Sequence, residues 1–215
     1  MTTVHCEESA LIEWRAMSKI AGILALQGDF AAHAKVLATL GVEARLVRRP
    51  DDLSGIDWLV LPGGESTTMS LLLDHTGLRN PLRALITGGM PTLATCAGVI
   101  LLAQRLMGDD GSVKVQPFGL LDATVDRNAF GRQADSFEAG LIIDWHALGS
   151  DDSQPAFRGV FIRAPRIATP GAQVQIIGQL DSEPVLVRQG NILAATFHPE
   201  LSGDSRLHAA VLGFD

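Results

Sequence analysis

A chain of 215 residues with 47% hydrophobic residues is large enough for one α/β domain with a sizeable core. Its formal net charge of −7 and its scattered basic residues argue against a nucleic-acid-binding protein, which needs Lys and Arg clustered on one surface. No apolar run approaches the roughly 20 residues that span a membrane. Together, these two observations lead us to expect neither nucleic acid nor membrane as a partner.

The cysteines and the amino-terminal segment bear on the compartment and the domain organisation. Two cysteines, Cys6 and Cys96, do not make a disulfide framework, and this favours a reducing cytoplasm. Residues 1–18 contain three glutamates where a secretory signal would have a positive start and an apolar run. We therefore expect residues 1–18 to be a disordered extension and residues 19–215 to form a single domain.

The first half of this domain alternates between strand and helix signals. Short apolar runs followed by Gly or Pro predict strands that are buried on both faces, as in a parallel sheet. The alternation indicates a parallel sheet with helices on both faces. The expected strands are 20–26, 42–48, 57–61 and 91–95, and the expected helices are 30–40, 67–75, 81–87 and 97–107.

The second half reads mainly as strands and predicts an antiparallel or mixed extension of the same sheet. Gly190 and Asn191 mark a hairpin turn between the last two strands. The expected strands are 120–128, 136–144, 159–163, 174–180, 184–189 and 192–197, followed by a final helix at 205–214.

Cys96 follows a predicted strand and precedes a predicted buried helix, between Thr95 and Ala97. A nucleophile on such a sharp strand-to-helix turn has its side chain exposed at the edge of the sheet. The N-terminus of the next helix favours the thiolate, which is the reactive form. The alternative from this pattern alone is a buried structural cysteine.

His198 lies directly after the last apolar strand, at the edge where α/β proteins bind ligands. Glu200, two residues later, could accept a hydrogen bond from the imidazole and fix its tautomer, as the third member of a catalytic triad does. A structural histidine is the alternative for His198 by itself. Cys, His and Glu at sheet edges together favour nucleophilic catalysis.

The segment 62–66, Pro-Gly-Gly-Glu-Ser, follows a third strand. Its glycines allow the backbone to turn tightly and to direct an N–H group at a ligand. Acyl transfer needs donors where negative charge develops on the carbonyl oxygen, and the N–H groups of Gly64 and Ala97 are the candidates. A plain turn is the alternative, and the phosphate-loop pattern is absent.

Metal and cofactor sites are not indicated. The histidines show no HxxxH or HxH spacing and there is no CxxC, so we expect no metal and no cofactor. His33, His75 and His208 are expected to be ordinary helix-surface or interface residues.

Several segments in a fixed order resemble a known family. LALQGDFAAH, LVLPGGESTTM, TCAGVILLA, DRNAFGRQADSFEA, GVFIRAP and FHPEL resemble the glutaminase subunits of pyridoxal 5′-phosphate synthase, which are class I, triad-type glutamine amidotransferases. The resemblance covers about residues 19–201. PGGESTTM, RNAFGRQ and FIRAP are the most specific segments. Ala94 departs from the pattern, because a glycine is common at that position.

The resemblance implies a three-layer, flavodoxin-like α/β fold with a central, mostly parallel sheet, and hydrolysis of L-glutamine to glutamate and ammonia. By this resemblance Cys96 is the nucleophile, His198 the general acid and base, and Glu200 the residue that orients the imidazole. Other positions match residues that hold the substrate glutamine: Gly64, Glu65, Ser66, Arg127, Ile162 and Arg163. An arginine suits the α-carboxylate, whereas the alternative for both arginines is a surface charge.

The resemblance also implies a partner, a (β/α)-barrel synthase subunit. That subunit combines ammonia with ribose 5-phosphate or ribulose 5-phosphate and with glyceraldehyde 3-phosphate to make pyridoxal phosphate. Family members are weak glutaminases until the synthase docks.

Three other functions are alternatives: an amidotransferase subunit that serves another synthase, such as the histidine-pathway one, a non-enzymatic module with a decayed triad, and a cysteine-based stress protein on a similar fold. RNAFGRQ and FIRAP argue against the first, and the presence of all three triad residues argues against the second. The third predicts no preference for glutamine.

Overall fold

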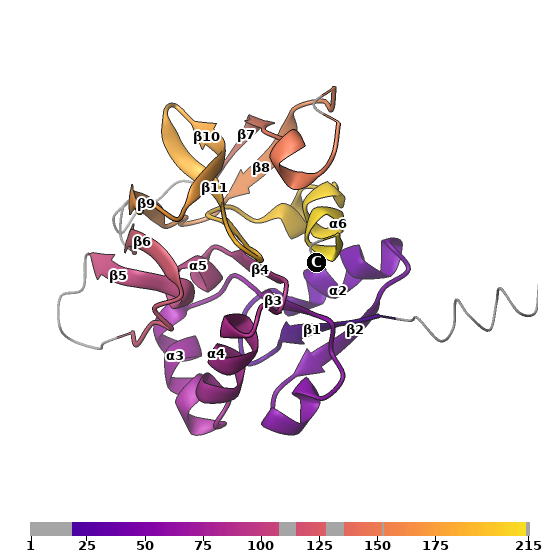
Figure 1. Cartoon of the computed structure of the whole chain (residues 1–215), viewed down its shortest axis with the longest axis vertical. Helices are drawn as coiled ribbons and strands as arrows, with labels where there is room; N and C mark the ends of the chain where they lie inside the picture. Colours follow the sequence, from indigo (N-terminus) through magenta and orange to yellow (C-terminus); the bar gives the residue numbers. More distant parts are fainter. Residues whose placement is uncertain (1–18, 108–114, 128–135, 152, 214–215) are drawn as a thin grey trace, which may run out of the picture.

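The computed structural model describes residues 19–107, 115–127, 136–151 and 153–213 (Figure 1). The extension expected at residues 1–18 lies outside the described residues, as does most of the segment RNAFGRQ. In the described part of the chain, no helix is both long enough and apolar enough to cross a membrane.

A nine-stranded mixed sheet forms the centre of the molecule, in the order β2-β1-β3-β4-β12-β11-β10-β7-β8. The strands from β2 to β12 pair in parallel, and the remaining pairs from β12 to β8 are antiparallel. The strands are β1 (Ile20–Leu24), β2 (Glu43–Val47), β3 (Trp58–Leu61), β4 (Thr92–Thr95), β7 (Phe137–Ile143), β8 (Phe157–Phe161), β10 (Gln175–Leu180), β11 (Glu183–Gln189) and β12 (Ile192–Ala195).

Burial explains why the apolar runs form the parallel strands. Every residue of β3, β4 and β12 is buried, so these strands are covered on both faces. The helices are α2 (Phe30–Thr39), α3 (Ser66–His75), α4 (Arg79–Thr87), α5 (Ala97–Leu102) and α6 (Arg206–Leu212). Apolar side chains of α3, α4 and α5 belong to one core cluster, and those of α2 and α6 belong to a second. The predicted α/β fold, with a parallel centre and an antiparallel extension, is confirmed.

Short 3-10 helices are present at Pro50–Leu53, His146–Leu148 and Pro199–Leu201. The predicted hairpin is present, since β11 pairs with β12 across Gly190, whose φ is 55°. In Figure 1, β7, β8, β10 and β11 lie in the upper part of the view, and β1, β2 and α2 lie at the lower right.

Two expectations for the chain after Cys96 are wrong. The helix expected at 97–107 ends at Leu102, and β5 (Ala103–Met107) follows it. The apolar run stops where Gln104 and Arg105 are exposed, and β5 instead pairs in parallel with β6 (Leu121–Asp126).

A separate three-stranded sheet therefore exists, in the order β5-β6-β9. The strand expected at 120–128 belongs to this sheet and not to the extension of the large one. Its outer strand, β9 (Arg166–Pro170), was not expected, because a short segment that is half exposed and ends in proline carries little strand signal.

The parallel centre of the large sheet assembles the candidate site. Parallel strands end at one edge of a sheet, so the segments after β1, β3, β4 and β12 meet there. These segments contain Gln27, the loop 62–66, Cys96 and His198.

Gly98 fixes the distance between α5 and β3. An added Cβ at this position would lie 2.2 Å from the carbonyl oxygen of Leu61, a backbone atom that cannot rotate away. We expect Gly98→Ala to lower the free energy of unfolding by about 1–3 kcal/mol, the usual cost of overpacking a core. Urea denaturation measures this loss.

The matched control is Gly140→Ala in β7, where the added Cβ would have its nearest neighbour at 3.8 Å, the Cβ of Ala156. The free energy of unfolding of this variant should lie within about 1 kcal/mol of the wild-type value. Equal stability of Gly98→Ala and the wild type would show that β3 and α5 are not in fixed contact.

Candidate functional site

Cys96 occupies a strained backbone position between β4 and α5. Its φ of 47° and ψ of −106° lie outside the regions that L-residues usually adopt. Such strain costs about 1–3 kcal/mol and is typical of functional residues. The Cys96 N–H donates to the carbonyl of Ala195 at 2.9 Å, and its own carbonyl accepts from Val99. Ala94 is buried in β4 between its partners Leu61 and Ala194, so its methyl group fits without removing this turn.

Gly63 places the loop 62–66 directly against the other two segments. A Cβ added to it would lie 2.4 Å from Cε1 of His198 and 3.3 Å from Cβ of Cys96. The Cys96 turn, the His198 imidazole and the glycine loop 62–66 therefore meet in one place, which is the arrangement that the sequence predicts for a nucleophilic site.

His198 and Glu200 form a buried hydrogen-bonded pair. The Nδ1 atom of His198 lies 2.7 Å from Oε1 of Glu200, and the side chains are 8% and 0% exposed. A carboxylate only accepts, so Nδ1 carries the proton of this bond. The Nε2 atom is left for the thiol, although it makes no hydrogen bond of normal geometry among the described residues. Such bonds often tighten only when the substrate is bound.

The pKa of His198 shows that its surroundings favour the imidazolium. Burial is the largest influence and lowers the pKa, but the close approach of Cys96 and the hydrogen bond with Glu200, together with the charges of both, outweigh it and raise the pKa to about 10.

The two proposed oxyanion donors directly follow residues of the site: Ala97 follows Cys96, and Gly64 follows Gly63, which contacts the Cys96 turn. Ala97 is the first residue of α5, so its N–H has no acceptor within the helix. The Gly63 carbonyl accepts from the Asp29 N–H at 3.2 Å, and a trans peptide directs the Gly64 N–H to the opposite side. Gln27 fastens the same loop, because its Oε1 accepts from the Glu65 N–H at 2.7 Å.

Glu65 and Ser66 begin α3. The Glu65 carboxylate accepts from the N–H groups of Thr67 and Thr68 at 2.9 and 2.6 Å. Burial would raise the pKa of this carboxyl, but these bonds outweigh it and lower the pKa. The sequence did not indicate this capping role, which uses one lone pair of each oxygen and leaves others available. Ser66 is buried.

Arg127, Ile162 and Arg163 approach the site from other elements. Nη2 of Arg127 donates to Oγ1 of Thr67 at 2.9 Å, which brings this arginine to the first turn of α3. The Ile162 carbonyl lies 3.9 Å from Sγ of Cys96. Arg163 is exposed and has a φ of 46°, a second strained residue beside the thiol.

The expectation for His33 and His208, a helix surface or an interface, is met at the contact between α2 and α6 and not at a surface. Both are buried, at 0% and 1% exposure, whereas His75 is exposed as expected. Their rings are 5.1 Å apart between centroids, and His33 lies next to Glu200. The sequence places each histidine in an apolar helix, but only the fold brings α2 and α6 together.

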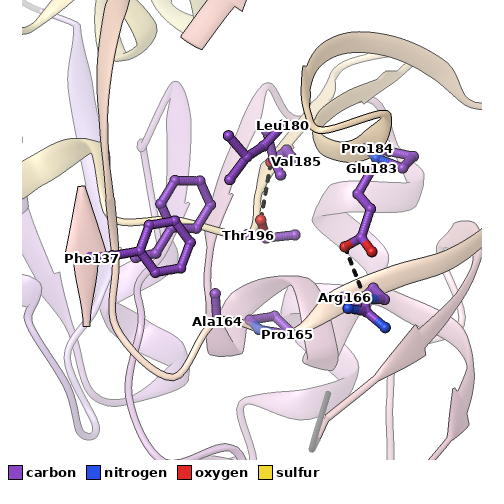
Figure 2. A pocket seen from close by; sticks show the side chains of 10 residues that line it. Phe137, Ala164, Pro165, Arg166, Leu180, Glu183, Pro184, Val185 and Thr196 are labelled. Atoms are coloured by element: carbon purple, nitrogen blue, oxygen red, sulfur yellow. Dashed lines mark hydrogen bonds and ion pairs between the residues drawn. The ribbon is translucent and has the colours of Figure 1, made fainter. Parts of the chain in front are cut away.

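A small pocket lies behind the segment 161–166 (Figure 2). It is lined by Phe137, Phe161, Ala164, Pro165, Arg166, Leu180, Glu183, Pro184, Val185 and Thr196. Arg166 and Glu183 form an ion pair at 2.9 Å across it. The pocket contains no triad residue and is distinct from the candidate site. Among the described residues, no group of three or more His, Cys, Asp and Glu could hold a metal ion.

Comparison with known proteins decides the family. The model of the SNO glutamine amidotransferase family matches residues 23–212. The chain belongs to this family of glutamine amidotransferases. Curated relatives named pyridoxal 5′-phosphate synthase subunit PdxT include those of Thermotoga maritima, 48% identical over 87% of this chain and 94% of the relative, and Dehalococcoides mccartyi, 50% identical over 87% and 92%.

Solved structures agree with the SNO family assignment. A crystal structure described as a glutamine amidotransferase has 42% identity and a TM-score of 0.80, over 90% of this chain and 97% of that one. The structure of PurLQS from Thermotoga maritima has 16% identity and a TM-score of 0.66, over 92% and 99%, and it shows the shared fold alone.

The raised pKa of His198 predicts how stability depends on pH. Its value in the folded chain, about 10, exceeds the ordinary 6.5, so the imidazolium stabilises the fold fully below about pH 6.5. That stabilisation is lost as pH rises through about 10. We expect the free energy of unfolding to fall more steeply between pH 7 and 10 in the wild type than in His198→Asn. Urea denaturation across this range measures both slopes, and parallel slopes would refute the pairing of His198 with its neighbours.

Proposed function

We propose that this chain hydrolyses L-glutamine through a triad of Cys96, His198 and Glu200 and supplies the ammonia to a (β/α)-barrel synthase subunit for pyridoxal 5′-phosphate synthesis. The observation that carries the proposal is the 2.7 Å bond between His198 and Glu200, with the imidazole held against the strained Cys96 turn. Membership of a glutamine amidotransferase family supplies the reaction class.

In the first half of the reaction, the Cys96 thiolate attacks the side-chain amide carbon of glutamine. A C–S bond forms, and the negative charge on the amide oxygen is stabilised by the N–H groups of Gly64 and Ala97. The His198 imidazolium then gives its Nε2 proton to the amide nitrogen, and the C–N bond breaks. Ammonia leaves and a glutamyl thioester remains.

In the second half, His198 acts as a base. Its neutral Nε2 takes a proton from water, whose oxygen attacks the thioester carbon. The C–S bond breaks, Cys96 returns to the thiolate and glutamate departs. Throughout the reaction, Glu200 keeps the proton of His198 on Nδ1, so that Nε2 always faces the reacting atoms.

The substrate's α-amino and α-carboxylate groups need opposite charges around them. We assign the carboxylate to Arg127 and Arg163, because a guanidinium binds a carboxylate with two parallel hydrogen bonds. Glu65 is negatively charged and suits the ammonium group. The Ile162 carbonyl lies beside the thiol, and we assign Ser66, at the start of α3, to the same substrate pocket.

The relatives that match this chain are named subunits of pyridoxal 5′-phosphate synthase. These names support a synthase partner that receives the ammonia. We place both proteins in the cytoplasm. Near neutral pH free ammonia is mostly protonated and a poor nucleophile, so direct transfer between subunits protects it.

Substitution of the triad residues tests the proposal. We expect Cys96→Ala to abolish ammonia release from glutamine, because the substitution removes the sulfur that attacks the amide. His198→Asn should reduce kcat by about 10²–10⁴-fold, the usual contribution of general acid–base catalysis. A coupled glutamate dehydrogenase assay measures both, and ammonia release by Cys96→Ala would contradict the assignment.

The partner is tested with a purified barrel subunit. With ribose 5-phosphate and glyceraldehyde 3-phosphate present, the wild-type chain plus the barrel subunit should form pyridoxal phosphate when glutamine is added. Cys96→Ala should do so only when ammonium chloride is supplied. Formation of pyridoxal phosphate is followed by its absorbance. If the wild-type pair needs added ammonium, the transfer between subunits is refuted while glutamine hydrolysis is not.

A further inference from the structure

A buried polar cluster lies behind the proposed triad, where α2, the end of β4 and α6 meet. It consists of His33, Thr95 and His208, all at most 1% exposed, and it adjoins Glu200. Nε2 of His33 lies 3.4 Å from Oε2 of Glu200 and 3.3 Å from Oγ1 of Thr95. Nδ1 of His33 lies 2.9 Å from Nε2 of His208.

Glu200 needs a second donor. Its Oε1 accepts from His198, but its Oε2 is also buried and makes no hydrogen bond of normal geometry among the described residues. Burying a carboxylate oxygen without a donor is costly. The nearby His33 Nε2 is the group placed to satisfy it.

The neighbours of His33 select one of its two neutral tautomers. A neutral imidazole has one N–H and one lone pair. If Nδ1 carried the proton, the Nε2 lone pair would face the Glu200 carboxylate and repel it. With the proton on Nε2, the N–H is shared between Glu200 and Thr95, which accounts for two contacts that are both slightly long.

His208 completes this arrangement. When Nδ1 of His33 is an acceptor, Nε2 of His208 must be the donor at 2.9 Å. The Nδ1 of His208, which has no hydrogen-bond partner among the described residues, then carries only a lone pair. In this arrangement each N–H group of the two rings has an acceptor.

The electrostatics are consistent with neutral rings. Burial, followed by the repulsion from His208 and His198, holds the pKa of His33 well below its ordinary value. Burial lowers the pKa of His208 to about 4. Near neutral pH both rings can donate without adding a positive charge that would compete with His198 for Glu200.

We propose that His33 is a positioning residue for glutamine hydrolysis, donating from Nε2 to Oε2 of Glu200, and that His208 holds it in this tautomer. With both oxygens occupied, the carboxylate cannot rotate, and Oε1 stays aligned with Nδ1 of His198. The inference rests on the proposed triad. It adds a link from α6 through α2 to the imidazole.

The test compares His33→Leu with His33→Gln, each in the full-length chain with the barrel subunit. Leucine has a similar size and no donor, whereas the glutamine amide can place an N–H near the position of Nε2. We expect His33→Leu to reduce kcat for glutamine hydrolysis by about 10–100-fold, as loss of a residue that orients a functional side chain does elsewhere. The KM for glutamine should stay within about twofold, and His33→Gln should recover most of kcat.

A matched control separates positioning from loss of stability. Ser70→Ala removes another buried hydrogen-bonding group, one that contacts Arg79 and Gln116 and no triad residue. It should lower the unfolding free energy with kcat unchanged. If His33→Leu retains wild-type kcat, or if His33→Gln is as impaired as His33→Leu, the proposal is overturned.

A second pair keeps the test open if His33→Leu does not fold. His208→Leu frees the tautomer of His33 and should lower kcat by about threefold or more, whereas His208→Gln retains a donor and should not. Equal kcat in this pair overturns the role of His208. The triad itself is judged separately by Cys96→Ala: if that variant releases ammonia, the proposed function fails, and if it is inactive while His33→Leu is normal, only the present inference fails.

Discussion

The carboxylate of Glu200 is entirely removed from water, and its burial determines which groups must surround it at the candidate site. Its side chain is 0% exposed, and such a charge is stable only when donors surround it. One donor is the imidazole that follows β12, and the second comes from α2. The charge therefore ties the parallel centre of the sheet to a helix on one of its faces. Burial lowers the pKa of His198, but the contacts with Cys96 and Glu200 outweigh it and raise the pKa.

Close approach of backbones is the second requirement, and glycines provide it. A side chain at Gly28 would overlap the carbonyl of Gly63, and one at Gly63 would overlap the His198 ring. The glycines of the segments LQG and PGG thus have a steric role at the place where three strand ends converge. Cys96 lacks such freedom and adopts a positive φ as a non-glycine residue, which the surrounding contacts must enforce.

Local patterns were sufficient to predict the parallel centre and to place Cys96, His198 and the loop 62–66 at one edge of it. Apolar runs bounded by glycine identify β1, β3 and β4, and their ends identify Cys96 and the loop 62–66 because parallel strands share an edge. The second sheet as a unit was not predictable, although the strand β6 was expected. The segment β5 reads as the end of a helix, since the choice depends on its distant partner, β6.

The same reason explains which site residues were missed. Gln27 and His33 each act across the fold, on Glu65 and on Glu200, and no spacing in the sequence records such contacts. The sequence left both a helix surface and an interface open for His33. The role of Glu65 as a helix cap was equally hidden, because glutamate is not among the residues that usually occupy this position.

The first turn of α2 has a consequence for how chain length can vary in relatives of this protein. The Asp29 N–H is bonded to Gly63 at one end, and His33 contacts Glu200 four residues later. This stretch is a rigid spacer of about one helical turn, with a rise of about 1.5 Å and a rotation of about 100° for each residue. Inserting or deleting one residue would swing the imidazole to another face of the helix, so natural length changes should be confined to the far end of α2 and the turn that follows it.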